Sequence, residues 1–269
     1  MEGLYLYCLR EKVEGNPLIS IKGIYGKGDM FVLPYGELEA VVSRVSLEEF
    51  DSGAIQIKAQ EDLTWIKEKA VIHERVIEEA MKKDDKILAL IPMRFGTIFK
   101  EEARLKETLD KDYEKIKQVF DKIIGKQEWC LKVYLKDKKI FEQMIKEVNE
   151  AIKEKEREIA SLPEGMAFFM EEELKEIVSK EMDKELNNIV EVLFESLKKQ
   201  AVQSRRNKIL EKELTGRREP MVLNAAYLIP EEKIEEFKKE AERLKQEIQE
   251  KGFYPEYSGP WPAYDFTSY

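Results

Sequence analysis

Residues with the chemistry of a general base or a nucleophile are scarce in this chain, and His73 is its only histidine. An imidazole is the usual proton acceptor near neutral pH, so a Ser-His-Asp or Cys-His apparatus would depend on this one side chain. His73 falls on the apolar stripe of a predicted helix, which favours a half-buried packing residue with one hydrogen-bonded nitrogen over a base or a ligand. No Gly-x-Ser-x-Gly motif supports a nucleophile. We therefore expect no catalytic residue and no enzyme.

Residues that would hold a metal or a cofactor are equally sparse. Cys8 and Cys130 are the only cysteines, and with a single histidine they are too few for a zinc site built on Cys and His. Glu171–Glu173 could form an acidic metal site, but a solvated helix start is favoured because the helix dipole attracts negative charge there. Neither of the glycine-rich phosphate-loop patterns occurs. The sequence predicts no metal and no cofactor.

One candidate binding segment is Pro92–Thr97, in which Arg94 and Phe95 stand within an otherwise apolar stretch. The arginine is either part of an anion or partner site, or a buried guanidinium paired with one of the many carboxylates. Both interpretations stay open at this point.

A second candidate is the basic segment Gln203–Arg218, which includes Arg205 and Arg206. A solvated loop is the default interpretation, and docking on an acidic protein surface is the functional alternative. RNA binding is a further idea that salt-sensitive binding would test.

The sequence ends in a third candidate, a tail rich in proline and aromatic residues that contains Trp261, Tyr264 and Phe266. Its prolines exclude a regular helix. The three rings either bind a partner or clamp the tail onto the second half of the protein, and the clamp is the favoured interpretation.

Composition narrows the class of protein. Of 269 residues, 38% are charged and the formal net charge is −9, so a generic nucleic-acid binder is disfavoured. No run of about 18 apolar residues is present, which predicts no membrane span. Met1–Arg10 lacks the pattern of a signal peptide. We expect a cytoplasmic protein with reduced thiols.

The elements that position these segments follow from hydrophobic periodicity. The first half predicts strands at 4–9, 19–23, 30–34, 38–45 and 87–91, and helices at 60–83 and 101–124. Short turns between the early strands indicate antiparallel pairing. Gly125 is a helix stop, and we place a domain boundary there.

The second half predicts strands at 129–135, 221–229 and 253–257, with a weak β signal at 201–204. Its helices are expected around 140–158, where Lys153–Glu158 would be a charged end in water, and at 171–199 and 231–251. This order is close to the split β-α-β arrangement of ferredoxin-like domains. The expected fold class is α+β with two domains: a mixed N-terminal domain, 1–125, and a ferredoxin-like C-terminal domain with long amphipathic helices and the tail, 126–269.

Nearly end to end, the sequence resembles the gas vesicle accessory proteins F and L, which form one family. The matching segments are Leu4–Tyr7, the helix around His73 with Val76, Leu90–Thr97, Glu128-Trp129, Leu223–Ile229 and Gly259–Phe266. The Pro-x-Arg-Phe-Gly-Thr and Gly-Pro-Trp-Pro-x-Tyr-x-Phe elements, in this order and spacing, are specific together.

The resemblance implies a two-domain protein that is not an enzyme. It implies a minor gas vesicle component or assembly factor that binds the small, very hydrophobic shell protein, prevents its aggregation during nucleation, and meets other gas vesicle accessory proteins. The alternative function is a small-molecule-binding or enzymatic ferredoxin-like protein that uses the His73 and Arg94 region. Candidate partner-binding residues are Arg94, Phe95, Arg205, Arg206, Trp261, Tyr264 and Phe266.

Overall fold

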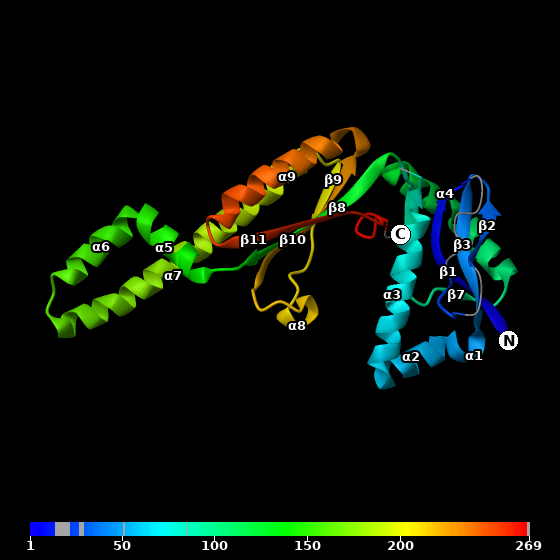
Figure 1. Cartoon of the computed structure of the whole chain (residues 1–269), viewed down its shortest axis with the longest axis horizontal. Helices are drawn as coiled ribbons and strands as arrows, with labels where there is room; N and C mark the ends of the chain where they lie inside the picture. The colour runs from blue at the N-terminus through cyan, green and yellow to red at the C-terminus, as the bar shows by residue number, and fades with distance from the viewer. Residues whose placement is uncertain (14–21, 27–29, 51, 85, 268–269) are drawn as a thin grey trace. The chain divides into compact units, whose positions relative to one another are not determined.

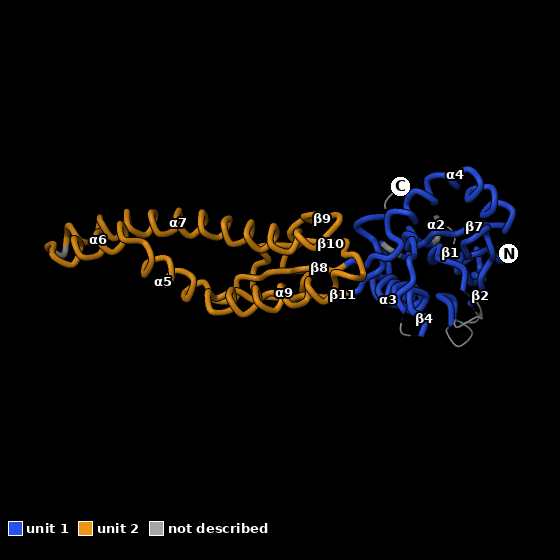
Figure 2. Tube along the Cα trace, turned by 90° about the horizontal axis from the view of Figure 1, so that it is seen from above, with its two compact units in different colours: residues 1–128, 260–269 blue, residues 129–259 orange. Residues whose placement is uncertain are grey.

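The computed structural model describes residues 1–13, 22–26, 30–50, 52–84 and 86–267 (Figure 1). The protein divides into two compact units (Figure 2). Unit 1 contains Met1–Glu128 and Pro260–Tyr269, and unit 2 contains Trp129–Gly259. The expected strand at 19–23 lies mostly outside the described residues.

Unit 1 is built on an antiparallel sheet around a central strand. Its strands are β1 (Glu2–Glu11), β2 (Met30–Tyr35), β3 (Leu38–Ser46), β6 (Leu90–Pro92) and β7 (Ile98–Phe99). β1 pairs with β3 along its length and, on its other side, with β6 and β7. Residues 3–10 of β1 are all buried, so both faces of this central strand are covered. Antiparallel pairing of the early strands is thereby confirmed.

Among the described residues of unit 1, four helices and a small hairpin accompany the sheet. They are α1 (Leu47–Phe50), α2 (Ser52–Glu61), α3 (Leu63–Ala80), α4 (Glu102–Ile123), β4 (Lys82–Lys83) and β5 (Lys86–Ile87). The single helix expected at 60–83 is wrong, because Asp62 ends one helix and caps the next by accepting a hydrogen bond from the Trp65 amide at 2.9 Å. α3 packs along β1, and α4 lies against β6 and β7.

Unit 2 carries a four-stranded sheet in the order β11-β8-β10-β9. Its strands are β8 (Lys126–Leu135, which begins in unit 1), β9 (Gln203–Arg206), β10 (Met221–Pro230) and β11 (Phe253–Trp261, which ends in unit 1). Its helices are α5 (Lys138–Val148), α6 (Glu150–Ala160), α7 (Glu164–Lys198), α8 (Lys212–Thr215), the short 3-10 turn η1 (Glu231–Lys233) and α9 (Ile234–Gln249). The core lies where α7 and α9 pack on β10.

One helix expected in unit 2 needs correction. The helix expected through 140–158 is broken at Asn149, whose extended backbone ends α5 and whose side chain accepts the Ile152 amide to start α6. The charged stretch 153–158 forms the last part of α6 and keeps Glu154, Arg157 and Glu158 exposed, as expected of a helix end in water. The flanking Ile152 and Ile159 are buried where α6 packs on α7.

The long helix α7 starts at Glu164, directly after Pro163, and not at about 171. Its N-terminal half runs past the sheet with α5 and α6 against it (Figure 2). Glu172 and Glu173 therefore lie inside the helix, where they pair with Lys175 and Lys155. Within the part of the protein that the structure describes, none of the helices combines the length and apolarity needed to span a bilayer.

Candidate functional site

The segment Pro92–Thr97 forms a tight turn between β6 and β7 that is tied to β1. The Met93 amide donates to the Tyr7 carbonyl at 2.8 Å, and the Thr97 carbonyl accepts from the Leu6 amide at 2.9 Å. Inside the turn, the amide and the hydroxyl of Thr97 both donate to the Arg94 carbonyl, at 3.2 and 2.7 Å. These bonds fix the backbone from which the Arg94 side chain projects.

His73 connects α3 to this turn. Its Nε2 lies 3.1 Å from the Met93 carbonyl oxygen, which only accepts, so Nε2 carries the proton. Its Nδ1 lies 3.1 Å from the Tyr5 hydroxyl and accepts from it. The Tyr5 oxygen in turn accepts from the Gly96 amide at 2.8 Å. His73 is 2% exposed and both nitrogens are bonded, so it is buried more deeply than the sequence predicted.

Burial decides the charge of His73. Desolvation of the imidazolium lowers the pKa of His73 to about 4, against a smaller opposing effect of the hydrogen bond to Met93. The side chain is therefore neutral near pH 7, and its one lone pair is already used by Tyr5. Burial also raises the pKa of Tyr7 to about 12. This arrangement suits a structural link and leaves no nitrogen facing a substrate.

Arg94 is exposed, so the interpretation as a buried, paired arginine is wrong. A buried arginine is found instead at Arg10, which no motif singled out. Its Nε donates to Glu39 at 2.7 Å and its Nη1 donates to the Ala80 carbonyl at 2.9 Å, with the guanidinium 0% exposed. Among the described residues, Arg94 takes part in no ion pair or side-chain hydrogen bond.

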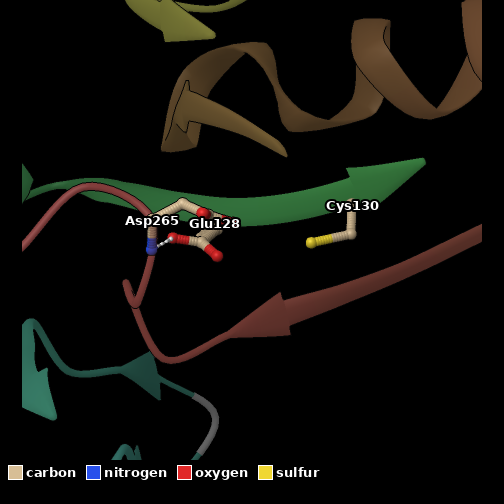
Figure 3. Close-up of side chains that lie close together, drawn as sticks. All are labelled: Glu128, Cys130 and Asp265. Carbon is tan, nitrogen blue, oxygen red and sulfur yellow. Dashed lines mark hydrogen bonds between the residues drawn. The ribbon is translucent and has the colours of Figure 1, made fainter. Parts of the chain in front are cut away.

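The tail packs within unit 1, and the expected clamp onto the second half is wrong. The Tyr264 hydroxyl donates to Glu74 of α3 at 2.8 Å, and Lys122 of α4 donates to the Phe266 carbonyl at 2.8 Å. Figure 3 shows a third bond, from the Asp265 amide to the Glu128 carboxylate at 3.0 Å, with Cys130 two residues further along β8. These polar groups give the tail its partners in unit 1.

The three tail rings differ in exposure. Phe266 is 5% exposed and packs beneath Lys122, whereas Trp261 and Tyr264 are 37% and 39% exposed. Phe266 is therefore a core residue of unit 1, and only the other two present surface to a partner.

α3, the turn and the tail enclose a pocket of about 490 Å³, which we call the Arg94 pocket. It is lined by Ala70, His73, Glu74, Pro92, Met93, Arg94, Phe95, Thr97, Tyr264 and Thr267. Three predicted residues, Arg94, Phe95 and Tyr264, thus meet at one site. Burial raises the pKa of Glu74, the hydrogen bond from Tyr264 lowers it, and the nearby Glu78 raises it further.

Arg205 and Arg206 lie in unit 2, on β9 at one edge of the sheet, and not in a loop. Arg206 pairs with Glu191 at 2.5 Å and its guanidinium stands 4.3 Å from the centre of the Phe194 ring. Both arginines are exposed. Charged side chains on a short edge strand oppose edge-to-edge pairing, which gives them a structural role as well.

Exposed apolar side chains at the start of α7 were missed by the sequence reasoning. Met166, Phe168 and Phe169, which we call the α7 tip, are 60%, 60% and 76% exposed. The signal was the apolar run Met-Ala-Phe-Phe ahead of three glutamates. Between α5 and α7, a groove of about 520 Å³ has Phe141, Leu174 and Met182 among its lining residues.

Comparison with known proteins gives concordant matches. The family model described as "Gas vesicle synthesis protein GvpL/GvpF" matches residues 3–268. "Gas vesicle protein L" of Streptomyces sp. (strain CB03234) is 23% identical over 265 residues, covering 98% of this protein and 92% of that one. "Gas vesicle protein F" of Nostoc sp. (strain PCC 7120 / SAG 25.82 / UTEX 2576) is 27% identical over 184 residues, covering 67% of this protein and 70% of that one.

Two crystal structures share the mixed α+β fold. GvpF from Anabaena sp. PCC7120 superposes with a TM-score of 0.70 at 19% identity, covering 100% of this protein and 97% of the other. GvpF from Microcystis aeruginosa gives a TM-score of 0.68 at 20% identity and 99% coverage of both proteins.

Proposed function

The chain belongs to the gas vesicle synthesis protein GvpL/GvpF family, and from this premise we propose that it is an assembly factor which binds the hydrophobic shell protein and prevents its aggregation while a vesicle is nucleated. The observation that carries the proposal is the family match across residues 3–268. Membership supports an accessory role in gas vesicles; the shell protein as the client is the proposed part.

The physical requirement of such a client supports the proposal. A subunit that polymerises through β-strands and apolar surface aggregates unless those surfaces are covered before assembly. Its carrier needs apolar contact surface and must itself stay in solution. A net charge of −9 with 38% charged residues provides the second property.

The α7 tip and the groove between α5 and α7 are the surfaces best suited to the client. The tip exposes Phe168 and Phe169 within a surface of charged helices, and exposed apolar groups of this kind mark interaction sites. The groove offers apolar side chains with Lys138, Lys146 and Glu142 at its margin. An apolar segment of the shell protein would be taken out of water at both places.

We interpret unit 2 as a ferredoxin-like domain and the protein as two domains that meet near residue 125, with the tail from Pro260 belonging to the first domain and not, as expected, to the second. Numbered by their order in the sequence, β8 to β11 are the first to fourth strands of this unit, and they lie in the sheet in the order fourth-first-third-second. The helices α7 and α9 follow the first and third of these strands. This order supports the interpretation, with α5 and α6 as an addition before α7.

A non-catalytic role is part of the proposal. Both nitrogens of His73 are bonded within the protein, and its pKa of about 4 leaves it a weak base. We place the protein in the cytoplasm, associated with the gas vesicle and its other accessory proteins, without nucleic acid or membrane as partners. Vesicle formation that survives His73→Phe would exclude a catalytic histidine.

Light scattering of the shell protein, diluted from denaturant with and without the accessory protein, tests the proposal. The wild-type protein at equal micromolar concentration should suppress scattering and co-purify with the shell protein. Phe169→Ser should weaken both effects because it removes apolar contact area that is 76% exposed. Leu214→Ser is the matched control, since Leu214 on α8 is 74% exposed but lies outside the tip and the groove. Unchanged scattering with the wild-type protein would refute the proposal.

A further inference from the structure

We propose that the Arg94 pocket binds a carboxylate of a partner protein, carried by an aspartate, a glutamate or a terminal carboxylate that stands next to an apolar side chain. The inference rests on the proposed function in one respect, which is that the occupant is a protein. It adds a polar recognition site in unit 1 that is separate from the apolar surfaces of α5 and α7 in unit 2.

The unpartnered guanidinium is the first observation. Six other arginines form ion pairs with carboxylates of the same protein: Arg10, Arg44, Arg104, Arg206, Arg217 and Arg243. Arg94, like Arg75, Arg157 and Arg218, forms none with any residue that the structure describes, and what sets Arg94 apart is that it lines the Arg94 pocket. A guanidinium binds a carboxylate in a planar, two-pronged geometry, so a carboxylate from outside is its natural partner.

The backbone of Arg94 is fixed before any ligand arrives, and the exposed side chain projects from it. The Arg94 carbonyl accepts two hydrogen bonds from Thr97. The amide of the neighbouring Met93 donates to Tyr7, and the Met93 carbonyl accepts from His73. A preorganised backbone reduces the entropy lost on binding. The neutral His73 therefore acts here as a positioning residue that shapes the pocket.

The pocket also offers an apolar wall. Ala70, Pro92, Met93 and Phe95 supply it, and the volume of about 490 Å³ falls in the ~300–1,000 Å³ range of ligand sites. A bare carboxylate leaves this wall in contact with water. A carboxylate flanked by a leucine-like side chain covers it, and this favours a peptide segment over a small acid.

Glu74 restricts the ligand further. Its carboxylate lines the same pocket and accepts from the Tyr264 hydroxyl. Its negative charge repels every anion, but it repels a phosphate with two charges more strongly than a carboxylate with one. It can also accept an N–H from a peptide backbone. The pocket can therefore contact one carboxylate, one apolar side chain and one backbone N–H, and a peptide segment carries all three groups.

Fluorescence anisotropy with two labelled peptides tests the inference on the full-length protein. The peptides are N-terminally labelled, C-terminally amidated Ala-Leu-Glu-Leu-Ala and its counterpart with Gln in place of Glu. Because a charge-assisted hydrogen bond is lost with Gln, wild-type protein should bind the Glu peptide about tenfold more tightly. Arg94→Gln should abolish this preference, and Arg94→Lys should retain part of it.

Arg104→Gln is the matched control, because it removes the same charge from an exposed arginine of unit 1 outside the pocket and should keep the preference. Equal affinity of wild-type protein for both peptides, or a preference that survives Arg94→Gln, overturns the inference. If free acetate displaced the peptide at a concentration similar to that at which the peptide binds, the pocket would not distinguish a small acid from a peptide. That result would overturn the inference that its occupant is a protein. The scattering assay on the shell protein is independent, so failure there refutes the proposed function and leaves the peptide result in place.

Discussion

Replacing His73 with Gln should flatten the pH dependence of unfolding between about pH 7 and pH 5. The pKa of His73 is about 4 in the folded protein and has its ordinary value of 6.5 in the unfolded state. Below pH 6.5 the unfolded state binds the proton and the folded state does not. The free energy of unfolding therefore decreases as the pH is lowered, until the folded state also takes up the proton near pH 4. The difference between the two pKa values corresponds to a contribution of about 3 kcal/mol to the free energy of unfolding, of which about 2 kcal/mol is lost when the pH reaches 5.

Urea unfolding of wild-type protein and His73→Gln at several pH values, followed by circular dichroism, measures the effect. Because His73 is the only histidine, the difference between the two pH profiles isolates one imidazole. Carboxylates, including Glu74 with its pKa raised by burial, contribute to both proteins and cancel in the difference. A glutamine amide can donate to the Met93 carbonyl and accept from Tyr5, so the turn should keep its geometry.

Parallel pH profiles for the two proteins would refute the reasoning. So would an imidazole that titrates near pH 6.5 in an NMR experiment on the native protein, because the ring would then be hydrated and its link between α3 and the turn absent.

Three further changes test the packing around the site and the sheet. Arg10→Met should lower the free energy of unfolding by about 3–5 kcal/mol, because it leaves the buried Glu39 carboxylate unpaired; a loss under about 1 kcal/mol in urea titration would show that the pair is hydrated. Gly252→Ala should destabilise the protein by at least about 1–3 kcal/mol, since the backbone has a φ of +89° and the new Cβ would stand 2.5 Å from the Asp137 carbonyl oxygen; an unchanged melting temperature would contradict this. Phe266→Ala should cost about 3–5 kcal/mol through the cavity it leaves, and a smaller effect, near that of an exposed residue, would show that the tail is not part of the core of unit 1.

Local pattern was sufficient for most elements. The strands at 30–34 and 38–45 and the helix at 101–124 match β2, β3 and α4 closely, because amphipathic periodicity directly reflects which face is buried. The breaks at Asp62 and Asn149 were missed. In both places one polar side chain caps a new helix and redirects the backbone. Before Asp62, the residues of α2 carry no amphipathic period that would have predicted a separate helix.

The sequence predicted only part of the candidate site. Pro92–Thr97 and the tail were identified as unusual segments, but the sequence left open whether Arg94 was buried. Arg94 sits among apolar neighbours, whereas Arg10 ends an apolar run and is followed by Glu11 and Lys12. Arg10 is buried because it lies on the central strand β1 facing Glu39 and the end of α3, whereas Arg94 projects from a turn.

What the sequence by itself determined is the α+β class, the scarcity of groups for catalysis and the family, since these depend on composition, period and motif order. Only the tertiary structure decided that the tail belongs to unit 1, that His73 is neutral and fully bonded, and that Arg94, Glu74 and Tyr264 share a pocket. The physical reason is separation in the sequence. Tyr264 and Glu74 are separated by 190 residues and meet through one hydrogen bond, and no local pattern encodes such a contact.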